Sequence, residues 1–426
     1  MKYVTSYQCT LCNQTFPKDF EEMTCPSCGE KGILDVLYDY KAMKETVTKE
    51  YFKTCKEPSI LRYAPMMSIE LPKYETLQVG NTPLYKSKRL AEQLGLTSLY
   101  IKDEGVNPTA SLKDRASLVA CLKAIEKGQD TICCSSTGNA ASSLAGNAAK
   151  LGLQSVIFVP ERAPLGKLTQ LVMYGSNVIK VAGDYKATFK ASKKAIDDYQ
   201  LYNRNAAINP HLVEGKKTVA IEISEQLDFR PIDYVFVSVG DGCTIAGVYK
   251  GFYDLFQIGI IDKIPKIIGV QSDGCDPFYQ AYINNEPLKE QEENTIADSI
   301  AVGIPRNPVK GMNAVKKSNG FYMTVSDQEI LDAIETLGAL EGIFSEPAGA
   351  TATAGIIKLV EENALPKDAT IAVIVTGNGL KDLNSVASKV EEKTLLFNPN
   401  IDSDIQENPT IQGFIAQLKH RNKRQK

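Results

Sequence analysis

From about residue 80 onward, short apolar runs rich in β-branched residues alternate with segments of helical periodicity. The runs lie at 98–102, 131–135, 155–159, 177–181, 234–239, 267–271 and 370–375. The helical patterns lie at 113–127, 139–151, 187–200, 214–227, 244–256, 326–340 and 347–362. Strands that alternate with helices form parallel sheets whose two faces are both covered. The sequence therefore predicts an α/β fold, and its 426 residues suffice for roughly two to four domains.

The composition argues against several classes of function. A formal net charge of −3 gives no basic footprint for nucleic acid, and apolar runs such as 370–375 are too short to span a bilayer. The first residues lack the apolar core of a signal peptide, so we expect a cytoplasmic protein. With only two histidines, His211 and His420, a His-rich catalytic metal centre is nearly excluded. An enzyme of this composition must move protons with another type of residue.

Four of the ten cysteines fall within the first 28 residues, as two C-x2-C pairs: Cys9, Cys12, Cys25 and Cys28. Two such knuckles can hold one tetrahedral Zn²⁺ on four thiolates, and disulfides are disfavoured in a reducing compartment. A four-thiolate site has no open coordination position, so we expect a structural zinc that stabilises or docks this segment. The alternative is a vestigial or partly occupied set of ligands.

Three turns rich in small polar residues follow predicted strands: SSTGNAASS at 135–143, SVGDGCTIAG at 238–247 and VTGNGLKD at 375–382. In an open α/β sheet, ligands bind where such turns converge at the carboxyl ends of the strands. The second turn predicts a phosphate site, since Gly240 and Gly242 let backbone amides approach a ligand closely. A nicotinamide site with Asp273 as its ribose-binding acid is a weak alternative, because the turn lacks the full G-x-G-x-x-G fingerprint.

Lys113 begins a predicted helix, just after an Asn-Pro turn, in the segment NPTASLKDRAS at 107–117. A lysine at a helix N-terminus does not complement the helix dipole, which favours a lowered ammonium pKa and a nucleophilic amine. A lysine in a polar turn is usually only a solvated charge. In company with the three turns, however, Lys113 is the candidate catalytic residue.

Together these motifs resemble pyridoxal-phosphate enzymes of fold type II, the tryptophan-synthase-β type, and more narrowly the threonine synthase family. The resemblance covers about residues 7–390, and its further motifs are VGNTPL at 79–84, VEGKKT at 213–218 and SEPAGATATAG at 345–355. It implies two open parallel-sheet α/β domains with the cofactor between them, an N-terminal zinc-ribbon-like segment and a homodimer. The expected divisions are 1–45 for the ribbon, 46–119 with 215–395 for the large cofactor-binding domain, 120–214 for the small domain, and 396–426 for a C-terminal extension with a basic tail.

The resemblance also implies a role for individual residues. Lys113 would form the imine bond to pyridoxal phosphate and then act as general acid and base. Asn139 would donate a hydrogen bond to the cofactor's 3′-oxygen, and Thr376 would face its pyridine nitrogen. The cofactor's 5′-phosphate would be held by Gly240, Asp241, Gly242, Cys243 and Thr244. The α-carboxylate of a small amino-acid substrate would be received by Ser136, Thr137, Gly138, Asn139 and Ala140.

For the family, the implied reaction converts O-phospho-L-homoserine and water to L-threonine and phosphate, but one segment departs from the family pattern. The family commonly reads NSxNPxRxEGQKT where this chain reads NAAINPHLVEGKKT, at 205–218. Ala207 and Leu212 take the serine and arginine positions, and Asp241 replaces an asparagine. The phosphate of the substrate would be a second phosphate in the site, beside that of the cofactor. The loss of the arginine cation and the gain of the Asp241 carboxylate both oppose its binding, since one charge-assisted hydrogen bond contributes roughly 1.5–3 kcal/mol. The nearby cations that could compensate are His211, Lys216 and Lys217.

Two alternatives therefore stand beside the threonine synthase hypothesis. One is a paralogue that acts on another amino acid by β-elimination, β-replacement or carbon–carbon cleavage. The other is a zinc-ribbon adaptor or binding module without catalysis, which the intact Lys113, Asn139 and Thr376 disfavour.

Overall fold

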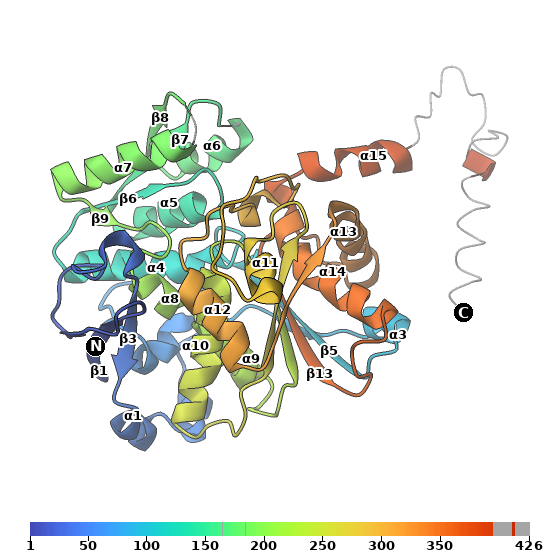
Figure 1. Cartoon of the computed structure of the whole chain (residues 1–426), viewed down its shortest axis with the longest axis horizontal. Coiled ribbons are helices and arrows are strands. Elements are labelled where there is room, and N and C mark those ends of the chain that lie inside the picture. Colours follow the sequence, from blue (N-terminus) through green and yellow to red (C-terminus); the bar gives the residue numbers. More distant parts are fainter. Residues whose placement is uncertain (164, 184, 395–410, 414–426) are drawn as a thin grey trace. The chain divides into compact units, whose positions relative to one another are not determined.

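The computed structural model describes residues 1–163, 165–183, 185–394 and 411–413. Two compact units are present, Met1–Asp382 and Leu383–Lys426. The second contains a single helical turn at Asn384–Val386 and helix α15 (Ala387–Lys393). Apart from 411–413, the predicted extension at 396–426, with His420, lies outside the described residues. All sheets described below belong to the first unit (Figure 1).

A six-stranded sheet is the largest element of the first unit (Figure 1). Its strand order is β12-β11-β10-β13-β5-β4, and all neighbours are parallel except β4, which is antiparallel to β5. The bounds are β4 (Leu84–Lys86), β5 (Ser98–Asp103), β10 (Tyr234–Ser238), β11 (Lys266–Ser272), β12 (Tyr322–Val325) and β13 (Thr370–Val375). Four of these confirm predicted runs. Strands β4 and β12 have three and four residues, too few to show a periodic signal in the sequence.

Helices cover both faces of this sheet, as the alternating pattern predicts. Two consecutive residues of β11 face opposite sides of the sheet. A Cβ built on Gly269 would lie near Ile245 of α10, whereas the side chain of Val270 lies against Gly355 of α14. Helices α9, α10, α11 and α12 share one apolar core with the strands, while α13 packs against both α14 and α3. The bounds are α3 (Arg89–Leu94), α9 (Thr218–Gln226), α10 (Cys243–Gln257), α11 (Pro277–Asn284), α12 (Pro308–Lys317), α13 (Asp327–Glu341) and α14 (Pro347–Glu361).

A second, four-stranded parallel sheet has the order β8-β7-β6-β9. Helices α4 and α5 pack on one apolar cluster of this sheet, and α7 packs on another that contains Cys133 and Phe158. The bounds are α4 (Lys113–Glu126), β6 (Thr131–Ser135), α5 (Asn139–Leu151), β7 (Gln154–Pro160), α6 (Leu165–Met173), β8 (Asn177–Val181), α7 (Tyr185–Tyr199) and β9 (Tyr202–Asn203). The single helix predicted at 214–227 is instead two short helices, α8 (His211–Lys216) and α9.

The N-terminal segment is a small antiparallel sheet, β2-β1-β3, followed by two short helices. The bounds are β1 (Val4–Cys9), β2 (Thr15–Pro17), β3 (Leu34–Tyr38), α1 (Tyr40–Thr46) and α2 (Lys49–Thr54). Its apolar side chains form one core with residues of α4, α9 and α10. The Lys310 ammonium of α12 lies 3.0 Å from the Asp35 carboxylate of β3. The segment is thus packed on the main body, while the finer division into domains stays a prediction. Within the described residues, no helix combines the length and apolar character needed to cross a bilayer.

Candidate active site

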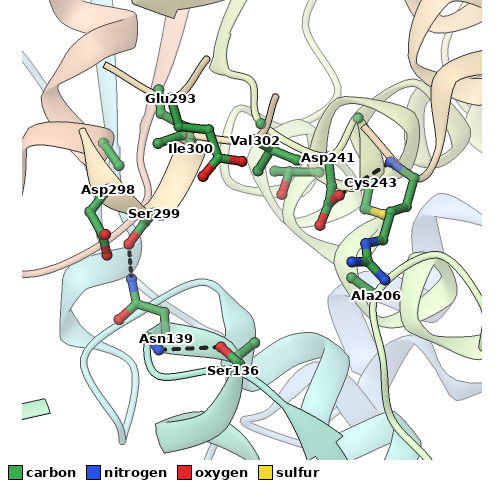
Figure 2. Close-up of a pocket in the computed structure, with 18 of the residues that line it drawn as sticks. Ser136, Asn139, Ala206, Asp241, Cys243, Glu293, Asp298, Ser299, Ile300 and Val302 are labelled. Carbon is green, nitrogen blue, oxygen red and sulfur yellow. Dashed lines mark hydrogen bonds between the residues drawn. The ribbon is translucent and has the colours of Figure 1, made fainter. Parts of the chain in front are cut away.

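A cavity of about 800 Å³ lies where turns that follow β6, β10 and β13 meet the first residue of α4. Figure 2 shows Ser136 and Asn139 across this cavity from Asp241 and Cys243. Every residue that the family resemblance assigns to the cofactor or the substrate lines it: Lys113, Ser136, Thr137, Gly138, Asn139, Ala140, Gly240, Asp241, Gly242, Cys243, Thr244 and Thr376. Segments up to 263 residues apart in the chain therefore contribute to one site, from Lys113 to Thr376 (376 − 113).

Lys113 is the first residue of α4, and the backbone around it is tied to the turn after β13. The amide of Leu112 donates to the carbonyl of Thr376 at 2.9 Å, and Ser111 forms an isolated bridge with Gly377. Burial lowers the pKa of Lys113 to about 8, and the neighbouring cation Lys216 acts in the same direction. A much larger fraction of the amine is therefore neutral and nucleophilic at pH 7 than for an exposed lysine.

A buried ion-pair network holds the first turn of α4 in place. It therefore also positions the backbone of Lys113, which belongs to the same turn. Arg115 Nε lies 2.7 Å from Glu104 Oε2, and its Nη2 lies 2.9 Å from Glu222 Oε1. Lys102 Nζ lies 2.5 Å from the same oxygen of Glu222. The side chains of all four residues are at most 3% exposed. Groups removed from water to this extent are stable only while they remain paired.

Glu346 is a cavity residue to which sequence reasoning assigned no role. It precedes Pro347 at the start of α14, and its Oε1 accepts a hydrogen bond of 2.7 Å from Asn139 Nδ2. Burial raises the pKa of Glu346 to about 7, although Lys381 and Lys113 oppose the shift. The signal for it was present in the motif SEPAGATATAG, which holds a single carboxylate directly before a helix.

The turn after β10 has the geometry of a phosphate cradle. Gly242, with φ +81°, precedes α10 directly, and a Cβ there would lie 2.6 Å from Phe278 and 2.8 Å from the carbonyl of Asn307. A Cβ on Gly240 would lie 2.9 Å from Ile300 Cα. Both positions therefore require glycine, and the turn leads directly into the N-terminus of α10, where backbone amides can bind an anion. A backbone phosphate cradle, an amine of lowered pKa and a hydroxyl after β13 are the groups that pyridoxal phosphate needs, so the site fits this cofactor.

The four cysteines of the N-terminal segment lie together. Their sulfurs are all within 4.8 Å of one another, and those of Cys12 and Cys25 are 3.7 Å apart. That separation is far beyond a disulfide bond of about 2.05 Å. It agrees with the edge of a tetrahedron whose centre-to-sulfur distance is about 2.3 Å.

The structure distinguishes the three cations that could compensate for Leu212. His211 is buried away from the cavity, with Nδ1 2.7 Å from Ser68 Oγ. Lys217 is fully buried and pairs with Glu214 at 2.5 Å and Asp254 at 2.6 Å. Lys216 alone of the three lines the cavity.

Comparisons with known proteins identify relatives of this chain. Residues 75–377 match the model of a family described as pyridoxal-phosphate dependent enzyme. Threonine synthase of Methanosarcina acetivorans is 39% identical over 399 residues, which is 93% of this chain and 96% of the relative. Threonine synthase of Methanocaldococcus jannaschii is 38% identical over 391 residues, which is 90% of this chain and 95% of the relative.

Two solved structures share the fold. The processed form of threonine deaminase isoform 2 from Solanum lycopersicum aligns with a TM-score of 0.64 at 23% identity, covering 74% of this chain and 88% of that one. Maize serine racemase aligns with a TM-score of 0.65 at 21% identity, covering 82% and 98%. These likenesses concern the fold alone, the parallel α/β architecture of fold type II.

Proposed function

Because the chain belongs to the threonine synthase family of pyridoxal-phosphate dependent enzymes, we propose that it converts O-phospho-L-homoserine and water to L-threonine and phosphate. The observation that carries this proposal is that Lys113, Asn139, Thr376 and the glycine turn all line one cavity. Deamination or racemisation, the reactions named for the two solved structures, is less favoured because those proteins are only 23% and 21% identical to this chain.

The proposed roles of the residues follow from where they lie. Bound pyridoxal phosphate supplies a conjugated ring that withdraws negative charge from the substrate carbons. Lys113 would hold the cofactor covalently, and its Nζ would move the proton at the substrate Cα. Thr376 offers a neutral hydroxyl to the pyridine nitrogen. The amides of Gly242, Cys243 and Thr244 bind the 5′-phosphate at the N-terminus of α10.

Glu346 acts in this proposal through Asn139. Asn139 Nδ2 donates to Glu346 Oε1 at 2.7 Å and, over a longer distance of 3.4 Å, to Ser299 Oγ. The hydrogen that faces Ser299 would turn to the cofactor's 3′-oxygen when the cofactor is bound. The amide can then keep one orientation when the substrate arrives. The turn from Ser136 to Ala140, which leads into α5, receives the substrate α-carboxylate.

The reaction itself is tested by product analysis. Incubated with O-phospho-L-homoserine, the holoenzyme is expected to release inorganic phosphate and L-threonine in equal amounts. O-phosphoserine, L-threonine and L-homoserine serve as comparison substrates and are expected to give less than a hundredth of that rate. Release of ammonia from an unphosphorylated amino acid, without turnover of O-phospho-L-homoserine, would instead support the paralogue.

We further propose that Cys9, Cys12, Cys25 and Cys28 hold a structural Zn²⁺. Reduced, freshly purified protein is expected to contain one equivalent of zinc, and a Cys25→Ser variant should lose it and unfold at lower temperature, because metal binding is coupled to folding. Cys55→Ser, outside the four-cysteine group, is the matched control and should keep both zinc and stability. Full stability of the wild type after complete removal of metal by a chelator would rule out a structural role.

The same family membership supports a homodimer. We also propose a cytoplasmic location.

A further inference from the structure

We infer that Lys216 and Arg204 form the binding site for the phosphate monoester of the substrate, in place of the arginine missing at Leu212. This inference rests on the proposed function and identifies the residues that give this site its specificity. Both cations line the active-site cavity, and neither has a carboxylate partner within the described part of the chain.

Burial makes the two unpaired cations unusual. Lys216 is 3% exposed and Arg204 is 1% exposed. Other buried cations of the described residues, such as Lys217 and Arg115, lie against carboxylates at 2.5–2.9 Å. A buried charge is stable only with a counter-charge, so two such cations at one cavity indicate an anionic ligand that completes the site.

Helix α8 directs Lys216 into the cavity. Leu212 and Lys216 lie four residues apart on this helix and therefore on the same face. Leu212 is fully buried in the core shared with α4 and α5, whereas Lys216, one turn later, lines the cavity. The Cβ of Lys216 would lie 2.8 Å from a Cβ built on Gly247 of α10, so its stem runs directly beside the helix that begins at the phosphate cradle.

Arg204 approaches the same space from the second sheet. Its amide donates to the carbonyl of Cys133 on β6 at 2.9 Å, which continues the pairing of β9 with β6. Its Nε and Nη2 donate to Ser117 Oγ of α4 at 3.2 and 3.1 Å. A single neutral hydroxyl orients the guanidinium but leaves its charge uncompensated, which suits bidentate recognition of a phosphate.

The directions of the pKa shifts indicate that the cations lie close to one another. Burial lowers the pKa of Lys113, and the nearby Lys216 lowers it further. Burial and Arg204 likewise lower the pKa of Lys216, although Cys243 and Asp241 act in the opposite direction. Three cations thus influence one another across a small volume. Asp241 is the acid of the cradle that opposes an anion, and it accepts a hydrogen bond of 3.3 Å from the amide of Arg306.

A phosphate monoester could come from the substrate or from the 5′-phosphate of the cofactor. The cradle at α10 already offers the cofactor a set of backbone amides and a helix N-terminus. We therefore assign the two side-chain cations to the substrate, and the experiment separates the two sources.

The experiment compares holoenzyme variants Lys216→Gln, Lys216→Arg and Arg204→Gln. Lys123→Gln is the control, since Lys123 is also 3% exposed but lies outside the cavity lining. For Lys216→Gln and Arg204→Gln we expect KM for O-phospho-L-homoserine to rise about 10- to 100-fold, as for the loss of a hydrogen bond to a charged group. Cofactor content and the dissociation constant of unphosphorylated L-threonine should change less than 3-fold. Lys216→Arg should recover most of the affinity, and Lys123→Gln should behave as the wild type.

Loss of cofactor from Lys216→Gln and Arg204→Gln, with unchanged KM in the fraction that keeps it, would assign the cations to the 5′-phosphate and overturn the inference. An equal loss of affinity for L-threonine would also overturn it, because that ligand has no phosphate. If the wild type does not turn over O-phospho-L-homoserine, the proposed function fails separately. Calorimetric titration of holoenzyme with inorganic phosphate then decides: binding lost in Lys216→Gln supports the anion site, and binding unchanged refutes it.

Discussion

A Lys113→Ala variant is expected to bind pyridoxal phosphate without a covalent bond and to lose at least about 10³-fold in kcat, since covalent attachment and proton transfer disappear together. The wild-type amine suits both tasks because burial lowers its pKa to about 8. At neutral pH roughly a tenth of it is neutral, against less than a thousandth for an ordinary lysine. The wild-type holoenzyme should be yellow, and borohydride should bleach it and fix the cofactor on the peptide that contains Lys113.

The control for this experiment is Lys123→Gln, a change of a buried lysine on the same helix that lies outside the cavity lining. It should keep the colour, the borohydride adduct and the activity. A covalent adduct that persists in Lys113→Ala would show that another amine carries the cofactor, and the assignment of the catalytic residue would then be wrong.

An Arg115→Met variant is expected to lower the free energy of unfolding by about 3–5 kcal/mol, because it leaves two buried carboxylates without their guanidinium partner. Arg115 pairs with both Glu104 and Glu222, and no side chain in the trio is more than 3% exposed. Since Arg115 belongs to the first turn of α4, the variant should also loosen the position of Lys113 and reduce covalent attachment of the cofactor. Urea unfolding of wild type and variant measures the first effect, and absorbance of the holoenzyme measures the second.

The pH dependence of this loss gives a second measurement. Burial by itself raises the pKa of Glu222, but Arg115 and Lys102 hold it well below its ordinary value. In the wild type the stabilisation from this carboxylate is therefore present above the unfolded-state pKa of about 4.3 and is lost as the pH falls through the lower folded-state value. In the Arg115→Met variant, Glu104 and Glu222 take up protons more readily because they have lost the guanidinium. The difference in free energy of unfolding between wild type and variant should therefore become smaller as the pH falls from 7 to 5.

A variant that breaks an exposed ion pair serves as the control. It shows whether the loss of stability is specific to the buried network or follows from the loss of any ion pair. Lys194 and Asp198 form an ion pair on α7 whose side chains are 74% and 51% exposed. Replacing Lys194 with methionine should leave the free energy of unfolding nearly unchanged, because water and salt screen an exposed pair. Equal effects of the two substitutions would contradict the role given to the buried network.

Much of the fold could be predicted because its signals are local. Seven apolar runs mark strands β5, β6, β7, β8, β10, β11 and β13, and glycine turns mark where they end. The edge strand β4 and the two-residue strand β9 could not be predicted, since pairing with a neighbour and not their own sequence defines them. Helix α6 was not predicted either. Its buried apolar residues Leu168 and Leu171 are identified only by their packing in the apolar cluster of the second sheet.

The sequence by itself determined the α/β class, the lysine at the start of α4, the three turns of the cavity and the cysteine pairs, because each depends on residues close together in the chain. Only the tertiary structure decided which side chains of distant segments meet. Asn139 and Glu346, 207 residues apart, share a hydrogen bond that no local pattern encodes. Among His211, Lys216 and Lys217, all within seven residues, only the packing of α8 against α4 and α10 determines which cation faces the cavity. The direction of a side chain on a helix depends on the helix's neighbours, and those neighbours come from distant parts of the chain.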